Sequence, residues 1–193
     1  MRDRGDSTIE VTAPRPAVFL DRDGVLNEAF VRDGKPIPPR SVREFRLLPG
    51  VVEACAELRD AGYALVVVTN QPDIARGTQT RAEVDRMHAV LREQLPLDEI
   101  CVCPHDDDSG CQCRKPRPGL LLDAAARLGL DLTRSVCVGD RWRDIEAGQR
   151  AGVQTIHIDC HYAERPADGA DAVVTDLPGA VRWLQGRSAW RVS

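Results

Sequence analysis

The segment Ala17-Val18-Phe19-Leu20-Asp21-Arg22-Asp23-Gly24 sets the architecture that we expect for the whole chain. Its four leading apolar residues are too few for a helix and predict a buried strand. Asp21 and Asp23 follow that strand two positions apart, so both project to the same side of an extended backbone. An isolated Asp-x-Asp-Gly is more often a solvated turn. Its position at the end of a buried strand favours a ligand site instead.

Apolar runs and amphipathic segments alternate along the rest of the chain. Further strands are predicted at 63–68, 100–103, 135–138, 153–158 and 172–174, and helices at 49–61, 81–95, 119–128, 144–151 and 177–185. This alternation is typical of an α/β fold, a Rossmann-like and mostly parallel sheet with helices on both faces. In such sheets ligands bind beyond the carboxyl ends of the strands.

Length and composition predict one folded domain. The chain has 193 residues, 42% hydrophobic and 29% charged, which suits a single domain over 16–193 preceded by a flexible tail at 1–15. The tail has no signal-peptide core, and no apolar run reaches the roughly 20 residues of a membrane span. A net charge of -4 argues against binding to nucleic acid. We expect a cytoplasmic protein without a membrane partner, and a monomer.

Polar residues that suit a phosphate and a cation follow three of the predicted strands. Thr69 and Asp140 come after strands 63–68 and 135–138, so a hydroxyl and a third carboxylate should join Asp21 and Asp23 at one sheet edge. Magnesium prefers oxygen ligands of this kind. Lys115 adds a positive charge that suits phosphate, although a basic residue is more often a solvated surface group.

A cluster of cysteines predicts a metal loop at 103–113. Three thiols and an imidazole fall within eleven positions, at Cys103, His105, Cys111 and Cys113. Four such ligands complete a tetrahedral zinc site and leave no open position, so the zinc would be structural. A Cys103–Cys111 disulfide or unligated thiols are the alternatives, and a reducing compartment disfavours the disulfide.

The motifs, in their order along the chain, resemble the haloacid dehalogenase superfamily of phosphohydrolases. The resemblance implies that Asp21 attacks phosphorus to give an aspartyl-phosphate, while Asp23 acts as the general acid and base. It also implies that Thr69 and Lys115 hold the phosphoryl group. Magnesium would be bound by Asp21, the backbone carbonyl of Asp23 and Asp140.

Within that superfamily, the zinc loop running into Arg114-Lys115-Pro116 is similar to the nearly capless heptose bisphosphate and histidinol phosphatase branch. The resemblance implies a sugar bisphosphate partner, D-glycero-D-manno-heptose 1,7-bisphosphate, that loses its 7-phosphate. Alternatives are histidinol phosphate, another small sugar or nucleotide phosphate, or an inactive zinc-stabilised binding module. The implied substrate-binding residues are Arg22, Asn27, Asn70, Gln71, Arg114 and Arg141, with Asp144 supporting the site from behind.

Several positions depart from the pattern or stay unassigned. Arg141 stands where the family usually has lysine, and the charged, Pro-rich loop at 28–46 is the segment expected to select the leaving group. His88 falls in a predicted amphipathic helix and is interpreted as a packing or surface residue. Cys160 and His161 receive no role.

Overall fold

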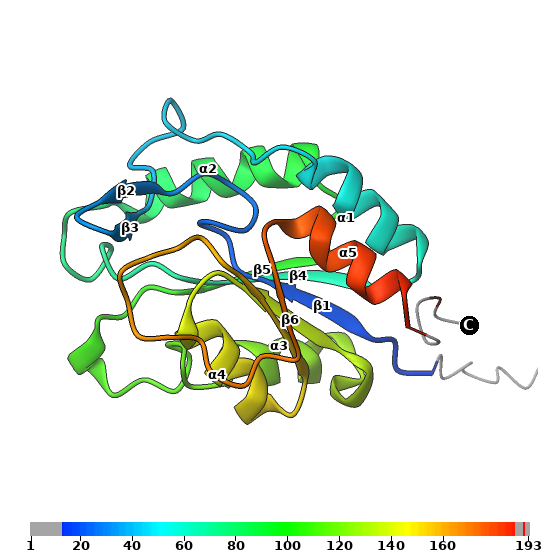
Figure 1. Cartoon of the computed structure of the whole chain (residues 1–193). Helices are drawn as coiled ribbons and strands as arrows, with labels where there is room; N and C mark the ends of the chain where they lie inside the picture. The colour runs from blue at the N-terminus through cyan, green and yellow to red at the C-terminus, as the bar shows by residue number, and fades with distance from the viewer. Residues whose placement is uncertain (1–12, 188–190, 192–193) are drawn as a thin grey trace, which may run out of the picture.

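The computed structural model describes residues 13–187 and 191 (Figure 1). Its strands are β1 (Ala17–Leu20), β2 (Phe30–Arg32), β3 (Lys35–Ile37), β4 (Ala64–Asn70), β5 (Glu99–Cys103), β6 (Val136–Gly139), β7 (Gln154–Ile158) and β8 (Ala172–Val174). Its α-helices are α1 (Val51–Asp60), α2 (Arg81–Gln94), α3 (Gly119–Leu128), α4 (Trp142–Ala151) and α5 (Leu177–Gln185). Two short 3₁₀ helices cover Asp107–Ser109 and Leu132–Arg134.

Six parallel strands form one sheet in the order β5-β4-β1-β6-β7-β8. From β1 the chain adds β4 and β5 on one side, and then returns to add β6, β7 and β8 on the other. The order therefore reverses beside β1, and open α/β sheets bind ligands at such a switch point. The predicted α/β fold is confirmed.

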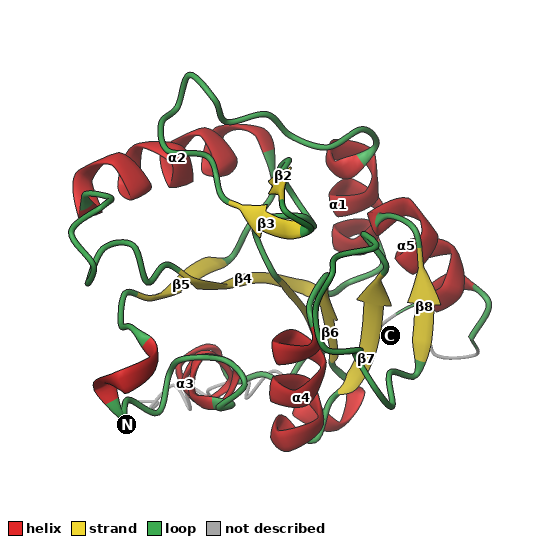
Figure 2. Cartoon of the chain, turned by 60° about the vertical axis from the view of Figure 1, so that its left-hand side comes forward, coloured by secondary structure: helices red, strands yellow, loops and turns green. Residues whose placement is uncertain are grey.

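Helices cover both faces of the sheet, as Figure 2 shows: α1, α2 and α5 on one face, α3 and α4 on the other. Side chains of β1 alternate between the two cores. Val18 and Leu20 pack under the first group of helices, and Ala17 and Phe19 under the second, all without exposed surface. Burial of each larger side chain stabilises the fold by about 1.5–3 kcal/mol.

The structure differs from the predicted elements at several places. β4 continues to Asn70 and thereby carries the polar residues that follow its apolar run. Helix α4 begins at Trp142, two residues before its predicted start. The 28–46 loop contains a hairpin of β2 and β3, whose turn places Asp33 and Gly34 at positive φ angles of 51° and 72°. Short strands with Pro and exposed side chains give no alternating apolar pattern, so the sequence did not reveal the hairpin.

The predicted flexible tail at 1–15 falls mainly on residues 1–12, which lie outside the described residues. Arg15 is described, and its backbone forms an isolated β-bridge with Leu130, while its side chain forms an ion pair with Asp98. Within residues 13–187, no helix has the length and apolar character needed to cross a membrane.

Asp98, the residue before β5, forms hydrogen bonds with three segments of the chain. Its carboxylate accepts hydrogen bonds from the Leu65 backbone N–H at 2.8 Å, from Arg59 Nη1 at 2.5 Å and from Arg15. Burial alone would raise the pKa of Asp98, but the donors around it outweigh burial and lower that pKa. The carboxylate therefore helps to hold the start of β4 against the turn into β5.

We expect Asp98→Asn to lower the free energy of unfolding by about 1–3 kcal/mol, measured by urea denaturation at pH 7. Because the folded-state pKa is depressed, this stabilisation is complete above the unfolded value of about 4 and disappears as pH falls through the folded value. The gap between variant and wild type should therefore close in acid. Asp60→Asn, at an exposed position of α1, is the control and should change stability by less than about 0.5 kcal/mol. Equal stability of Asp98→Asn and wild type at pH 7 would contradict the expectation.

Candidate active site

A cleft of about 170 Å³ opens at the carboxyl ends of β1, β4 and β6. The backbone N–H of Asp21 donates to the Val138 carbonyl at 2.9 Å, so the ladder between β1 and β6 extends to the candidate nucleophile. The structure brings most of the predicted residues to this cleft. Its lining includes Asp21, Asp23, Thr69, Asn70, Gln71, Lys115, Asp140, Arg141 and Asp144.

Lys115 is clamped at the base of the cleft. Its Nζ lies 2.8 Å from Asp21 Oδ1, 2.5 Å from Asp144 Oδ1 and 2.7 Å from the Val68 carbonyl oxygen. These three partners match the three protons of an ammonium group. Burial opposes the charge, but the carboxylates of Asp144 and Asp21 outweigh burial and raise the pKa of Lys115. The lysine is therefore a permanent positive charge beside Asp21.

Carboxylates crowd the other side of the cleft. Burial is the main cause that raises the pKa of Asp21 to about 6, against the opposing charge of Lys115. Burial, followed by repulsion from Asp21 and Asp144, raises the pKa of Asp140, and the Tyr162 hydroxyl offsets this only in part. Both oxygens of Asp140 are buried without a hydrogen bond of ordinary geometry. A buried carboxylate with unused oxygens is suited to a cation.

The acidic cluster fits a magnesium ion. Oxygens of Asp21, Asp140 and Asp144 lie within 4.8 Å of one another. Asp144 already accepts from Lys115 and, at 3.0 Å, from the Arg141 backbone N–H at the start of α4. Asp21 and Asp140 are therefore the side chains with capacity left for a metal. Gly24 lies against Asp140, and a Cβ there would come 1.9 Å from Asp140 Oδ2, so only glycine fits.

Asp23 is held by neutral and charged donors. Asn27 Nδ2 donates to its Oδ1 at 2.9 Å, and Gln71 Nε2 donates to its Oδ2 at 2.9 Å. Arg22 contacts both oxygens at 2.8 to 3.1 Å. Burial would raise the pKa of Asp23, but the charge and hydrogen bonds of Arg22, with the two amides, lower it.

Two predicted substrate-binding residues take a different place from the one expected. Arg22 and Asn27 have no exposed surface and do not line the cleft. Both side chains turn behind Asp23, because a buried carboxylate requires donors and these residues are the nearest ones along the chain. They hold the candidate acid and base rather than the substrate.

Asn70 and Arg141 frame the cleft from opposite sides. Asn70 Nδ2 donates to the Lys115 carbonyl at 3.0 Å, and its Oδ1 accepts from the Lys115 backbone N–H at 3.1 Å. This reciprocal pair fixes the lysine backbone to the end of β4. Arg141 Nε donates to Glu164 at 2.9 Å, which holds the guanidinium at the cleft wall.

Arg114 does not line the cleft in the structure, contrary to its predicted contact with the substrate. Its Nε donates to Asp107 at 2.9 Å and its Nη1 to the His105 carbonyl at 3.2 Å, so nearby acceptors of the cysteine-rich loop hold it. Arg76 and Arg143 line the cleft instead and were missed. Both lie in segments that follow the carboxyl ends of β4 and β6, but no motif singles out either arginine.

The cysteine cluster has the geometry of a zinc site. Cys103 Sγ lies 3.2 Å from Cys113 Sγ and 3.8 Å from Cys111 Sγ, and His105 Nδ1 lies 3.3 Å from Cys113 Sγ. Zinc bonds of about 2.0–2.3 Å place tetrahedral ligands roughly this far apart. All seven cysteines are free thiols, so the alternative disulfide is absent. The residues fit a closed zinc site.

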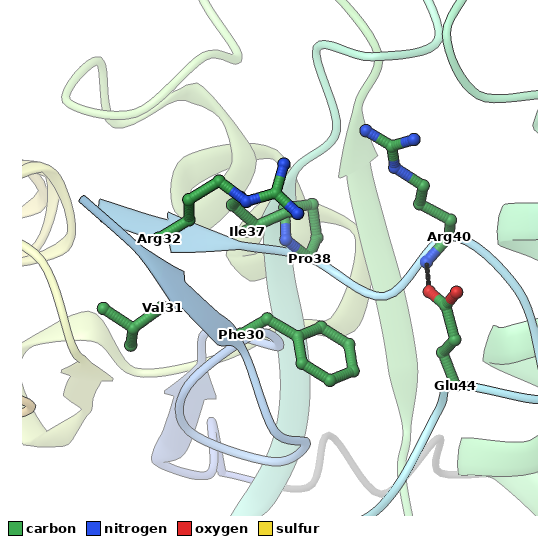
Figure 3. A pocket seen from close by; sticks show the side chains of 7 residues that line it. All are labelled: Phe30, Val31, Arg32, Ile37, Pro38, Arg40 and Glu44. Carbon is green, nitrogen blue, oxygen red and sulfur yellow. Dashed lines mark hydrogen bonds between the residues drawn. The ribbon is translucent and has the colours of Figure 1, made fainter. Parts of the chain in front are cut away.

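A larger hollow of about 480 Å³ lies on the hairpin side of the molecule (Figure 3). Phe30 and Val31 of β2 and Ile37 of β3 line it, with Arg40 donating its backbone N–H to Glu44 at 2.8 Å. None of the predicted catalytic residues borders it. Despite its smaller volume, the cleft above β1 is the candidate active site, because the titratable groups converge there.

Comparisons with known proteins find relatives that match most of the chain. The haloacid dehalogenase-like hydrolase family matches residues 29–152. D-glycero-beta-D-manno-heptose-1,7-bisphosphate 7-phosphatase of Photorhabdus laumondii is 36% identical over 88% of this chain and 97% of its own, and that of Escherichia coli K12 is 35% identical over 88% and 95%. The crystal structure of D,D-heptose 1,7-bisphosphate phosphatase from B. bronchiseptica, complexed with magnesium and phosphate, superposes with a TM-score of 0.76 at 33% identity, covering 88% of this chain and 98% of that one.

Fold and relatives define the class as a hydrolase of the phosphatase type. The chain belongs to the haloacid dehalogenase-like hydrolase family. The resemblance seen in its motifs is thereby confirmed. The described residues contain no large cap, since the insertion between β1 and α1 is only the hairpin and its flanking loops.

Proposed function

We propose that this phosphatase removes the 7-phosphate of D-glycero-D-manno-heptose 1,7-bisphosphate with the help of magnesium. The supporting observation is that relatives bearing this activity in their names match nearly their whole length at about 35% identity. A similar solved phosphatase was crystallised with magnesium and phosphate, the ligands that this cleft suits chemically. A small metabolite is consistent with a cleft of about 170 Å³.

In the first step, an Asp21 oxygen attacks phosphorus. The new Asp21–phosphorus bond forms as the ester oxygen departs, and that oxygen takes a proton from Asp23. Lys115 holds Asp21 at 2.8 Å and, with Thr69, faces the negative phosphoryl oxygens. With a pKa of about 6, Asp21 is mostly ionised at neutral pH, which is the nucleophilic form.

In the second step, water hydrolyses the aspartyl-phosphate. Asp23, left as a carboxylate, accepts the proton of the attacking water while the Asp21–phosphorus bond breaks. The donors around Asp23 favour the carboxylate, which suits this base role. For the acid role Asp23 takes up a proton once a phosphate ester lies beside it, because a nearby negative charge raises the pKa of a carboxyl group.

Both metals have residues that suit them. Magnesium would be held by Asp21, Asp140 and the Asp23 carbonyl, and when bound it offsets negative charge on the phosphoryl oxygens. Zinc in the 103–113 loop would hold the segment that leads into Lys115. Cysteines that bind a metal rather than form disulfides suit a reducing compartment, so we place the protein in the cytoplasm. We further propose that it acts as a monomer formed by a single domain over 16–193.

The test is magnesium-dependent phosphate release from a panel: heptose 1,7-bisphosphate, histidinol phosphate and common sugar and nucleotide phosphates. We expect the heptose bisphosphate to have the highest kcat/KM, and EDTA to remove the activity until magnesium is restored. Preference for histidinol phosphate would correct the substrate and leave the mechanism in place. Activity that survives EDTA would refute the magnesium mechanism, and no turnover of any ester would favour a binding module.

A further inference from the structure

His88 is a buried polar residue that the catalytic steps leave unused. It lies on the core face of α2 with Val84, Met87 and Leu91, and only 5% of its surface is exposed. Its Nε2 lies 3.1 Å from Nη1 of Arg22. This contact links α2 to the loop that carries Asp21 and Asp23.

The direction of this hydrogen bond is fixed by chemistry. A guanidinium has donors only, so Arg22 donates and His88 Nε2 accepts. The imidazole must then be neutral, with its proton on Nδ1. Burial, followed by the charge of Arg22, lowers the pKa of His88 to about 4, in agreement with a neutral ring at physiological pH. His88 therefore serves Arg22 as an acceptor.

Arg22 in turn sets the orientation of Asp23. Its Nε and Nη2 contact the Asp23 carboxylate, while Nη1 faces His88 and the guanidinium carbon lies 5.9 Å from the centre of the Phe45 ring. The backbone of Arg22 is already fixed, because its carbonyl accepts from the backbone N–H of Leu26 at 2.9 Å. The side chain is completely buried, and His88 supplies the acceptor for Nη1, the guanidinium nitrogen that does not contact Asp23.

We propose that His88 is a positioning residue for catalysis, which holds the Arg22 guanidinium so that Asp23 presents its carboxyl group to the leaving oxygen. The inference rests on the proposed function, in which Asp23 is the general acid and base. His88 touches neither substrate nor reacting atoms; it acts through Arg22. An accepting atom at the position of Nε2 is what the arrangement requires.

Leaving-group chemistry separates this role from simple packing. An alkyl phosphate needs a proton on its departing oxygen, whereas p-nitrophenyl phosphate releases a stable phenolate without one. The value of kcat/KM reports the steps up to transfer of the phosphoryl group to Asp21. Misplacement of Asp23 should therefore lower kcat/KM for the alkyl ester far more than for the aryl ester. The ratio of the two values does not depend on how much enzyme is folded.

The experiment compares His88→Leu, His88→Gln and wild type on the best sugar phosphate of the panel and on p-nitrophenyl phosphate. We expect His88→Leu to lose roughly tenfold in kcat/KM on the sugar phosphate and less than about twofold on the aryl ester. His88→Gln should stay close to wild type on both, because its amide oxygen can accept from Arg22. Val84→Ala, on the same buried face of α2, is the control and should leave the ratio unchanged.

Two results would overturn the inference: equal losses on both esters, or a Gln variant as impaired as the Leu variant. If His88→Leu does not fold, His88→Gln is compared with His88→Asn, whose shorter amide cannot reach Arg22, and the same ratio decides. A wild-type protein that hydrolyses neither ester would refute the proposed function and this inference with it.

Discussion

Asp21→Asn should abolish phosphatase activity, with kcat reduced at least about 1,000-fold. The amide preserves the shape of the side chain but is a poor nucleophile toward phosphorus. Stability should change little, by about 1 kcal/mol or less. Lys115 keeps its contact with Asp144, at 2.5 Å, when Asp21 loses its charge. Phosphate release and urea denaturation on the same preparation measure both effects.

The matched control is Asp85→Asn, an exposed carboxylate on α2 that forms a surface ion pair with Arg81. It makes the same chemical change away from the cleft and should retain wild-type kcat. Retention of more than a few per cent of wild-type activity in Asp21→Asn would exclude Asp21 as the nucleophile. If wild-type enzyme is denatured during turnover of a labelled substrate and carries no labelled phosphoryl group, this result would also argue against Asp21 as the nucleophile.

Cys111→Ser should release zinc and lower thermal stability. A serine hydroxyl is a weak zinc ligand, and the remaining three residues leave the tetrahedron incomplete. If the loop contributes about 3 kcal/mol, Tm should fall by about 6–12 °C for a chain of this size. Because the loop holds no reacting group, kcat measured well below either midpoint should change less than stability does. Metal analysis and calorimetry give the two readouts.

Cys160→Ser serves as the control for a lost thiol, since Cys160 lies outside the cluster, 3.8 Å from the Gly24 carbonyl. This variant should keep one zinc per chain and a Tm near that of wild type. The zinc assignment would fail if purified Cys111→Ser carried as much zinc as the wild type.

The strands, the helices and the charged core of the site followed from sequence, because each depends on local pattern. Asp21, Thr69 and Asp140 stand directly after buried strands, and parallel strands bring such positions together. The zinc ligands are close in sequence and need no tertiary knowledge. In contrast, side-chain direction depends on the nearest partner in space: Arg22 turns inward to Asp23 and His88.

The arginines of the cleft wall illustrate the same limit. The position of Arg114 in its motif suggests ligand binding, but its guanidinium donates to Asp107 in the same loop instead. Arg76 carries no motif, yet the fold brings it to the cleft. The spacing of residues in the sequence does not show which of several possible acceptors an arginine side chain will contact. The hairpin at 30–37 was not predicted for a related reason, because its exposed short strands lack an apolar face.

The net charge around Lys115 and Arg22 determines the order in which magnesium and phosphate bind. Four carboxylates, Asp21, Asp23, Asp140 and Asp144, meet two cationic side chains, Arg22 and Lys115, in a space largely shielded from water. The arginines of the cleft wall do not offset this charge, because Arg76, Arg141 and Arg143 pair with other carboxylates, Asp106, Glu164 and Asp107. When all six buried groups are ionised, the metal-free site therefore carries two uncompensated negative charges and repels a phosphate ester. A divalent cation cancels that excess, whereas a monovalent cation leaves half of it. We therefore expect inorganic phosphate to bind measurably only when magnesium is present, so that the cation governs affinity as well as turnover.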